Sequence, residues 1–458
     1  MFKSKRKRKN FSRDKIVSYP QIDRLNPEWP TPRVARFYKN FLQKQEPIYF
    51  LPYSKQKAPP LSVIFSMNVL RNREWNQSSA AHLLRRTMIG PTYNDIIDST
   101  NNRLNYTVST LLGELETPEP PGSWVEDPAP AWDQLTDDEV DELMQQYRDH
   151  MGEMATWWII RMTQNSKNIT EQMTLFWHNF FATVQSKVFF PQAMYEQNKI
   201  FREYGLGNFK ELLRRVTFGP AMMIWLDIHR SKKHNPNENF SRELMELFTL
   251  GVDNYSQNDI VEASRAFTGY VTNGVETNYD YENLVGNDIH WDEWHDFGNK
   301  TVLGQTGQWT GDDIINIILE QENCAKHICR RIYKWFVYEN VNESVVEEMA
   351  DVLRDNNYEI RPALEFLFKS EHFYDNNYRG ALIQNPMGFL PGLIRKFGME
   401  NFTFPNGYLL RSVEILGMTP LEPPDVNGWI GYRSWINSIT LPIRKLVGCS
   451  LVTGSSPF

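Results

Sequence analysis

Closely spaced helical segments, many with clear start or stop signals, constrain the fold of this chain most. The pattern predicts helices over about 137–164, 169–187, 193–204, 207–216, 236–250 and 257–268. Further helices are predicted at 78–90, 312–321, 323–338, 343–355 and 361–369, and residues 270–311 are predicted as a loop with short strands. Strand-like alternation is scarce. The sequence therefore predicts a mainly α fold: a large multi-helix domain with long loops and a few short strands.

The two ends of the chain differ from its middle. Residues 1–15 hold eight basic residues and one acidic residue, although the formal net charge of the whole chain is -7. We interpret residues 1–77 as a basic, extended arm, 78–445 as the helical domain and 446–458 as a C-terminal tail. A solvated tail is the preferred interpretation of the basic head, so nucleic acid is not an expected partner. No long apolar run occurs, which predicts no transmembrane helix, and no apolar segment typical of a signal peptide follows the basic head.

The segment from Asn235 to Gly251 carries several polar candidates for a functional site. Asn235 is predicted to cap a helix, Pro236 to occupy its first position and Gly251 to end it. At helical spacing one face is apolar, with Phe240, Leu244, Leu247 and Phe248. The other face carries Glu238, Asn239, Arg242, Glu243 and Glu246. That face suits a polar network or a site as well as it suits open water.

Other candidates lie elsewhere along the chain. His178, on a predicted helix, suits proton transfer, metal binding or a structural hydrogen bond. Asp227 ends an apolar run, where a carboxylate acts as a site residue, a cap or an ion-pair partner. The segment 288–300 packs two His and four carboxylates between Trp residues, which suits either a metal or a solvated acidic loop. Trp429, in a Pro- and Gly-rich turn series, offers a flat face for a sugar or for core packing.

These patterns yield two sets of candidate residues. The catalytic candidates are His178, Asp227, Glu238, Arg242, Glu243 and Glu246. The substrate-binding candidates are Asn179, Asn237, Asn239, Arg265, Lys300 and Trp429. We expect one polar cluster in the helical core, because buried charge needs partners; its members would be His178, Asn237, Glu238, Arg242 and Glu243, with Asp227 at the edge. The sequence assigns no cofactor and no metal ligands, and Cys324 and Cys329 are predicted as buried thiols.

Seven groups of motif residues occur in order along the chain. They lie at 81–86, 175–179, 207–209 with 220–222, 237–251, 264–269, 295–300 and 423–429. Together they resemble a bacterial family known only as domain of unknown function 1800, and the resemblance covers about residues 78–445. One motif departs from the family pattern. The family tract usually contains Phe-Trp-His-Asn-His-Phe, whereas Phe180 replaces the second His here. This departure puts a catalytic or metal-binding role for that His pair in doubt.

The resemblance implies a setting but no activity. Family members are often exported to the periplasm or cell envelope. They are often encoded beside a second family that resembles sulfatases and alkaline phosphatases. A sulfatase-like exported protein is therefore the partner that the resemblance implies.

Three functions remain open at this stage. The preferred one is an interaction or assembly protein of envelope or exported systems, because no G-x-S-x-G, H-E-x-x-H, P-loop or Rossmann motif occurs. The first alternative is a hydrolase acting on a polymer such as a polysaccharide. Carboxylates four residues apart on a helix have Cβ atoms about 6 Å apart, which permits paired acid and base groups. The second alternative is metal binding by His178 with Asp227 or His295.

Overall fold

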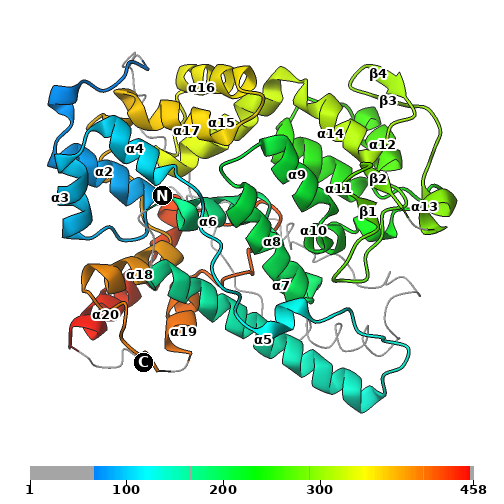
Figure 1. The fold of residues 1–458 in the computed structure, drawn as a ribbon, viewed down its shortest axis with the longest axis horizontal. Coiled ribbons are helices and arrows are strands. Elements are labelled where there is room, and N and C mark those ends of the chain that lie inside the picture. The colour runs from blue at the N-terminus through cyan, green and yellow to red at the C-terminus, as the bar shows by residue number, and fades with distance from the viewer. Residues whose placement is uncertain (1–66, 165–167, 288, 406, 454–458) are drawn as a thin grey trace, which may run out of the picture. The chain divides into compact units, whose positions relative to one another are not determined.

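The computed structural model describes residues 67–164, 168–287, 289–405 and 407–453 (Figure 1). The predicted fold class is confirmed, because helices dominate and only short strands occur among these residues. Most of the predicted N-terminal arm lies outside the described residues, as do residues 454–458. The described chain divides into a small unit, residues 130–143, and a large unit, residues 67–129 and 144–453. In the small unit, Thr136 and Glu139 form a capping box that opens helix α5 (Asp137–Gln164).

The large unit consists of helices joined by loops. Its first half contains η2 (Asn72–Glu74), α2 (Gln77–Thr87), α3 (Tyr93–Asn101), α4 (Leu104–Leu111), η3 (Ser123–Glu126), the rest of α5, α6 (Thr170–Phe180), α7 (Gln185–Val188), α8 (Pro191–Tyr204), α9 (Phe209–Phe218), α10 (Pro220–Trp225) and η4 (Ile228–Arg230). Then come α11 (Glu238–Glu243), the π-helix η5 (Leu244–Thr249), α12 (Gln257–Ala266), α13 (Ile289–Trp294), α14 (Gly311–Leu319), α15 (Glu322–Phe336), α16 (Glu343–Asp355) and α17 (Ile360–Lys369). The last elements are η6 (His372–Tyr374), α18 (Pro386–Lys396), α19 (Tyr408–Ile415), η7 (Tyr432–Trp435) and α20 (Thr440–Thr453).

Two short antiparallel hairpins interrupt the helices within the predicted loop region. Strand β1 (Tyr279–Asp280) pairs with β2 (Val285–Gly286). Strand β3 (Lys300–Val302) pairs with β4 (Gln305–Gly307), with Thr301 opposite Thr306. The short strands predicted for residues 270–311 are therefore present, together with one short helix, α13, that the sequence did not predict.

One continuous hydrophobic core joins most of the large unit. Helix α6 packs on α8, α8 on α9, and α9 on α10 and α14, while α15, α16 and α17 pack in sequence, as Figure 1 shows. Aromatic side chains fill the centre: Trp177, Phe180, Phe181 and Phe209 are almost fully buried. Burial of each such side chain stabilises the fold by roughly 1.5–3 kcal/mol. Helices α18, α19 and α20 pack on one another, and Leu390 on α18 and Val413 on α19 are fully buried.

The helix predicted over 169–187 is two helices, so that prediction was wrong. Helix α6 ends at Phe180, and α7 begins at Gln185. At the break, the Gln185 N–H donates to the carbonyl of Leu421 at 2.9 Å instead of to a carbonyl within a helix. The hydroxyl of Thr183 donates to the Gln197 side chain. These bonds to distant residues replace the local helical bonds, and no local pattern in the sequence encodes them.

The central helix begins later than predicted and changes its winding. Asn237, not Asn235, is the cap, because its side chain accepts the N–H of Asn239 at 2.9 Å. From Leu244 the helix is a π-helix, whose extra residue per turn rotates the side chains. Met245 is consequently buried, whereas Leu247 is only partly buried. Gly251 ends the segment with a positive φ of +80°, as predicted.

The structure also contains helices that the sequence did not predict, because they contain proline, lie in Pro- and Gly-rich sequence or are short. Helix α18 has Pro386 in its first turn and a second proline, Pro391, within it. Helix α19 lies inside the Pro- and Gly-rich region. Helix α20 continues past residue 445, where we placed the end of the helical domain.

Candidate functional site

Asn179, near the end of α6, fastens a loop that is distant in the sequence. Its side-chain Oδ1 accepts the backbone N–H of Trp429 at 2.7 Å. Gly428 has a φ of +76°, and a Cβ at that position would lie 2.3 Å from the Asn179 carbonyl oxygen. A glycine is therefore required for the close approach. Two of the motif groups, 175–179 and 423–429, thus meet through Asn179, which we had predicted as a substrate-binding residue.

His178 lies in an aromatic cage and not in the polar cluster that we predicted. Its side chain is 2% exposed, and its ring centre lies 5.3 Å from Trp158, 5.7 Å from Trp429 and 6.4 Å from Phe201. Nε2 has no hydrogen-bond partner within the described residues. Burial lowers the pKa of His178 to about 3, so the imidazole is neutral near neutral pH. Trp429 is also buried, at 8% exposure, and its ring packs near His178 instead of lying open to a sugar.

Glu171, on the same helix as His178, forms an ion pair with Arg202. Glu171 accepts two hydrogen bonds from Arg202, at 2.8 and 3.1 Å, and one from Trp158 Nε1 at 3.0 Å. Nε of Arg202 also donates to Asn198 at 2.9 Å. The side chains of Arg202 and Glu171 are 1% and 7% exposed. This buried ion pair joins α6 to α8, and the sequence reasoning missed Arg202.

The polar face of the central helix is half exposed, which corrects the predicted core cluster. Arg242 pairs with Glu238 at 3.2 Å, and these side chains are 38% and 41% exposed. Gln257, on α12, bridges both residues at 3.1 and 2.8 Å. Because Gln257 lies at the surface and binds both side chains there, the charges of Glu238 and Arg242 need no contact with His178. Asn239 is exposed as well.

Glu243 has the most perturbed carboxyl group on this face. Its pKa is raised to about 7, first by burial and then by the neighbouring Glu246, against an opposing effect of Arg242. Asp425, in the loop fastened by Asn179, raises that pKa further. Glu246 accepts a hydrogen bond from the Tyr255 hydroxyl at 2.9 Å. The structure therefore brings Glu243, Glu246 and Asp425 into one electrostatic environment, and the sequence reasoning missed Asp425.

Asp227 forms an ion pair at a chain turn, which was one of its three predicted roles. It has a positive φ of 60°, and its carboxylate lies 2.9 Å from Lys187 Nζ and 3.7 Å from Arg230. Its carbonyl oxygen accepts the Asn237 amide at 3.3 Å. The structure thus brings Asp227 and Asn237 together as an anchor for the segment that precedes α11.

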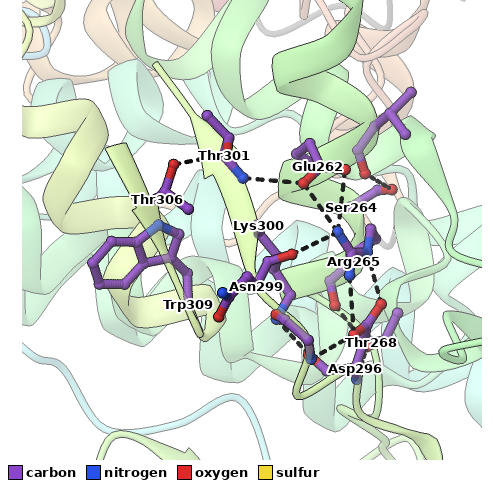
Figure 2. A network of polar contacts seen from close by, with 12 residues as sticks. Glu262, Ser264, Arg265, Thr268, Asp296, Asn299, Lys300, Thr301, Thr306 and Trp309 are labelled. Atoms are coloured by element: carbon purple, nitrogen blue, oxygen red, sulfur yellow. Dashed lines mark hydrogen bonds and ion pairs between the residues drawn. The ribbon is translucent and has the colours of Figure 1, made fainter. Parts of the chain in front are cut away.

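Arg265 and Lys300 belong to a network that ties α12 to the segment before β3 (Figure 2). Arg265 donates to Asp296 at 2.7 and 3.2 Å, to Glu262 at 3.0 and 3.2 Å and to the Asn299 carbonyl at 3.0 Å. Lys300, which is 1% exposed, donates to the carbonyls of Asp296 and Gly298. Because these donors are bound to the protein itself, the network holds a loop in place and leaves little for a substrate.

Metal-binding geometry finds no support in the part of the chain that the structure describes. No group of three His, Cys, Asp or Glu side chains there is arranged to hold an ion. His295 Nδ1 is hydrogen-bonded to the Thr268 carbonyl at 2.8 Å. Cys324 and Cys329 are buried, as predicted, and burial raises the pKa of the Cys324 thiol to about 12.

Arg331, on α15, is a further residue that the sequence reasoning missed. Its guanidinium lies 4.9 Å from the ring centre of Phe180, the residue that replaces the family's usual His. Nη2 donates to the Asn179 carbonyl at 3.5 Å, and burial lowers the pKa of Arg331 to about 10. An arginine over an aromatic face is a stabilising arrangement. Arg331 therefore packs on the end of α6 through the Phe180 ring and the Asn179 carbonyl.

A known protein family matches the part of the chain that contains these residues. A family model described as a protein of unknown function (DUF1800) matches residues 82–452. The chain belongs to this family. The match extends from α2 into α20, so it includes Asn179, Glu243 and Trp429.

The DUF1800 family supplies no reaction, so the chemistry must be argued from these contacts. No curated protein and no solved structure matches the chain. Among the described residues, no helix combines the length and the apolar character that crossing a membrane requires.

Proposed function

We propose that this DUF1800 protein is an interaction protein that assembles with another protein of an exported or envelope system. The observation that carries the proposal is the position of Ile430, whose side chain is 89% exposed. The preceding residue, Trp429, is buried and is held by Asn179. The fold therefore fixes the backbone beside an apolar side chain that it leaves in water, and several such side chains together are typical of a contact surface.

The segment that follows Ile430 adds further exposed apolar side chains. Ile439 is 68% exposed, Leu441 is 56% exposed and Leu446 is 52% exposed. They lie between η7 and the first half of α20. Interface cores are depleted of charge, and removal of such side chains from water contributes about 25 cal/mol per Å².

The polar motif residues support a binding role over a catalytic one. Asn179 holds the 423–429 loop, Asp227 pairs with Lys187, and Arg265 binds Asp296. Each of these side chains already has a protein partner that positions a loop. The family resemblance supplies the expected partner, a sulfatase-like exported protein.

Co-purification tests this proposal. The chain is expressed with the sulfatase-like protein encoded beside it in the source genome, and complex formation is measured by size-exclusion chromatography. Ile430→Asp is expected to abolish the complex, because it places a charge in an apolar contact. Val252→Asp is the matched control, since Val252 is 61% exposed but lies far along the sequence, after η5. Absence of a complex with the unmodified chain, or equal complex formation by Ile430→Asp, refutes the proposal.

A second candidate function, polymer hydrolysis, is favoured by one specific observation. The pKa of Glu243 is about 7, which is the range in which a carboxyl group serves as a general acid or base near neutral pH. Glu246 and Asp425 supply the neighbouring carboxylates. Under this proposal Glu243 donates a proton to the leaving oxygen of a polysaccharide, and a neighbouring carboxylate activates water or attacks the sugar.

Release of reducing ends from a panel of acidic and neutral polysaccharides tests the hydrolase candidate. Glu243→Gln is expected to lower the rate by about a hundredfold or more. Glu238→Gln on the same helix is the control, because Glu238 is 41% exposed and paired with Arg242. Failure of the unmodified protein to release sugars, or full activity of Glu243→Gln, counts against hydrolysis by this residue.

A further inference from the structure

A hollow of about 380 Å³, lined mostly by polar residues, opens beside the buried Glu171 and Arg202 pair. Its lining residues come from the chain before η3, from the end of α5, from α6 and from α8: Glu116, Thr117, Pro118, Arg161, Gln164, Glu171 and Arg202. The volume lies at the lower end of the range for small-molecule sites, roughly 300–1,000 Å³. We propose that this hollow binds a small hydroxylated carboxylate, the chemical class of a single uronic acid. The proposal does not depend on the protein partner or on hydrolysis.

Arg161 supplies the charge that a carboxylate needs. Its Nη2 donates to Gln164 at 2.5 Å, and no carboxylate pairs with its guanidinium within the described residues. Nε of Arg161 is buried and has no hydrogen-bond partner. A buried donor without an acceptor is unfavourable, and a carboxylate that accepts from a guanidinium at two points removes that cost. Arg161 is therefore the recognition group of the hollow.

The floor of the hollow is preorganised and electrically balanced. Arg202 is fixed by Glu171 and Asn198, and its guanidinium lies 5.3 Å from the ring centre of Trp157. Because Glu171 already neutralises Arg202, Arg161 is the arginine of the lining that has no carboxylate partner. A ligand with one negative charge therefore fits better than a phosphate or a sulfate, whose larger charge the Glu116 and Glu171 carboxylates oppose.

The remaining lining groups favour hydroxyls on the ligand. Thr117 carries a hydroxyl, Gln164 a carboxamide and Glu116 a carboxylate, all of which exchange hydrogen bonds with alcohols. An apolar carboxylate such as a fatty acid would place its hydrocarbon chain against these polar groups and would bind poorly. A hydroxylated ring with one carboxylate satisfies both sides of the hollow.

Isothermal titration calorimetry with sodium D-glucuronate tests the assignment. Glucuronate is expected to bind, and D-glucose and sodium sulfate are expected to bind at least about tenfold more weakly. Arg161→Gln should weaken glucuronate binding by about tenfold or more, and Arg161→Lys should weaken it as well, because lysine lacks the planar fork. Arg148→Gln is the matched control: Arg148 lies on the same helix, also donates to a glutamine three residues away and does not line the hollow.

Thermal melts of each variant establish that it is folded, as expected for a partly exposed arginine without an ion pair. Equal binding of glucuronate and glucose, equal binding of sulfate, or unchanged binding by folded Arg161→Gln would overturn the assignment. Absence of heat from glucuronate at millimolar concentration would overturn it too.

Discussion

The Glu171 carboxylate and the Arg202 guanidinium face each other through two hydrogen bonds, of 2.8 and 3.1 Å, in a region where both side chains are almost fully buried. Trp158 and Asn198 occupy further positions around the pair. Each charge is thus compensated inside the fold. A buried pair of this kind is sensitive to the loss of either member, because the remaining charge is left largely desolvated and without its counter-charge.

The first prediction concerns that sensitivity. Arg202→Met is expected to lower the free energy of unfolding by about 3–5 kcal/mol, because Glu171 is left charged and unpaired in the core. Urea denaturation followed by circular dichroism at neutral pH measures the loss. Arg242→Ala is the control, and it should cost less than about 1 kcal/mol, since the pair with Glu238 is half exposed. An equal decrease in the free energy of unfolding in the two variants would show that the Glu171 and Arg202 pair stabilises the fold no more than an exposed ion pair does.

The contrast between Arg202 and Arg242 shows which features of the fold could be predicted from the sequence and which could not. Helical periodicity and capping residues predicted most helices, because those signals are local; the capping box of Ser256 and Asp259 at the start of α12 is an example of such a signal. The choice of the buried arginine depends on which helices pack together. Arg202 meets Glu171 across 31 residues of sequence, and no local pattern encodes such a contact. The predicted cluster therefore centred on the wrong helix.

The motif residues show the same limit. The sequence identified Asn179, Gly428 and Trp429 within separate motifs, but their meeting depends on a backbone approach between α6 and the loop 423–429. The π-helix from Leu244 was not predictable from spacing, since bonds such as that from the Leu250 N–H to the Met245 carbonyl, five residues back, alter the period within one segment. Phe180 was visible as a departure from the family pattern, whereas its contact with Arg331 required the fold.

The second prediction concerns the pH dependence of stability through His178. Its pKa is about 3 in the folded protein because of burial, against an ordinary value of 6.5. Between these values the unfolded chain binds the extra proton, so the free energy of unfolding falls as the pH is lowered from about 6.5 toward 3. One such group contributes up to about 1.4 kcal/mol per pH unit.

His178→Phe removes this contribution and keeps an aromatic side chain in the cage. The free energy of unfolding of this variant is expected to fall less steeply between roughly pH 6 and pH 4. This range lies between the folded and unfolded pKa values of His178. His234→Phe, at an exposed position, should leave the slope unchanged. Urea denaturation at several pH values provides the slopes, and identical slopes in the two variants would mean that His178 is protonated in the folded state.

The third prediction has the opposite sign and concerns Glu243. Its pKa is raised to about 7 in the folded protein from an ordinary value of 4.5, so the folded state binds the extra proton between these values. The stability linked to that proton is present below about pH 4.5 and is lost as the pH rises through about 7. Glu243→Gln is therefore expected to raise the melting temperature more at alkaline pH than at acidic pH. Glu238→Gln should show no such pH-dependent gain, and a uniform shift for Glu243→Gln would contradict the raised pKa.

The fourth prediction compares two glycines with similar backbones and different surroundings. Gly428 has a φ of +76°, and its Cβ would lie 2.3 Å from the Asn179 carbonyl oxygen, whereas Gly304 has a φ of +83° with open space around it. Gly304→Ala adds only backbone strain, roughly 1–2 kcal/mol. Gly428→Ala adds the same strain and also displaces the 423–429 loop from α6, for a total of about 2–5 kcal/mol.

Because that loop positions Ile430, Gly428→Ala should also weaken binding of the protein partner, whereas Gly304→Ala should not. Urea denaturation and size-exclusion chromatography of the complex measure the two effects, and matched losses in both glycine variants would show that the approach of Asn179 to the loop contributes nothing to the fold.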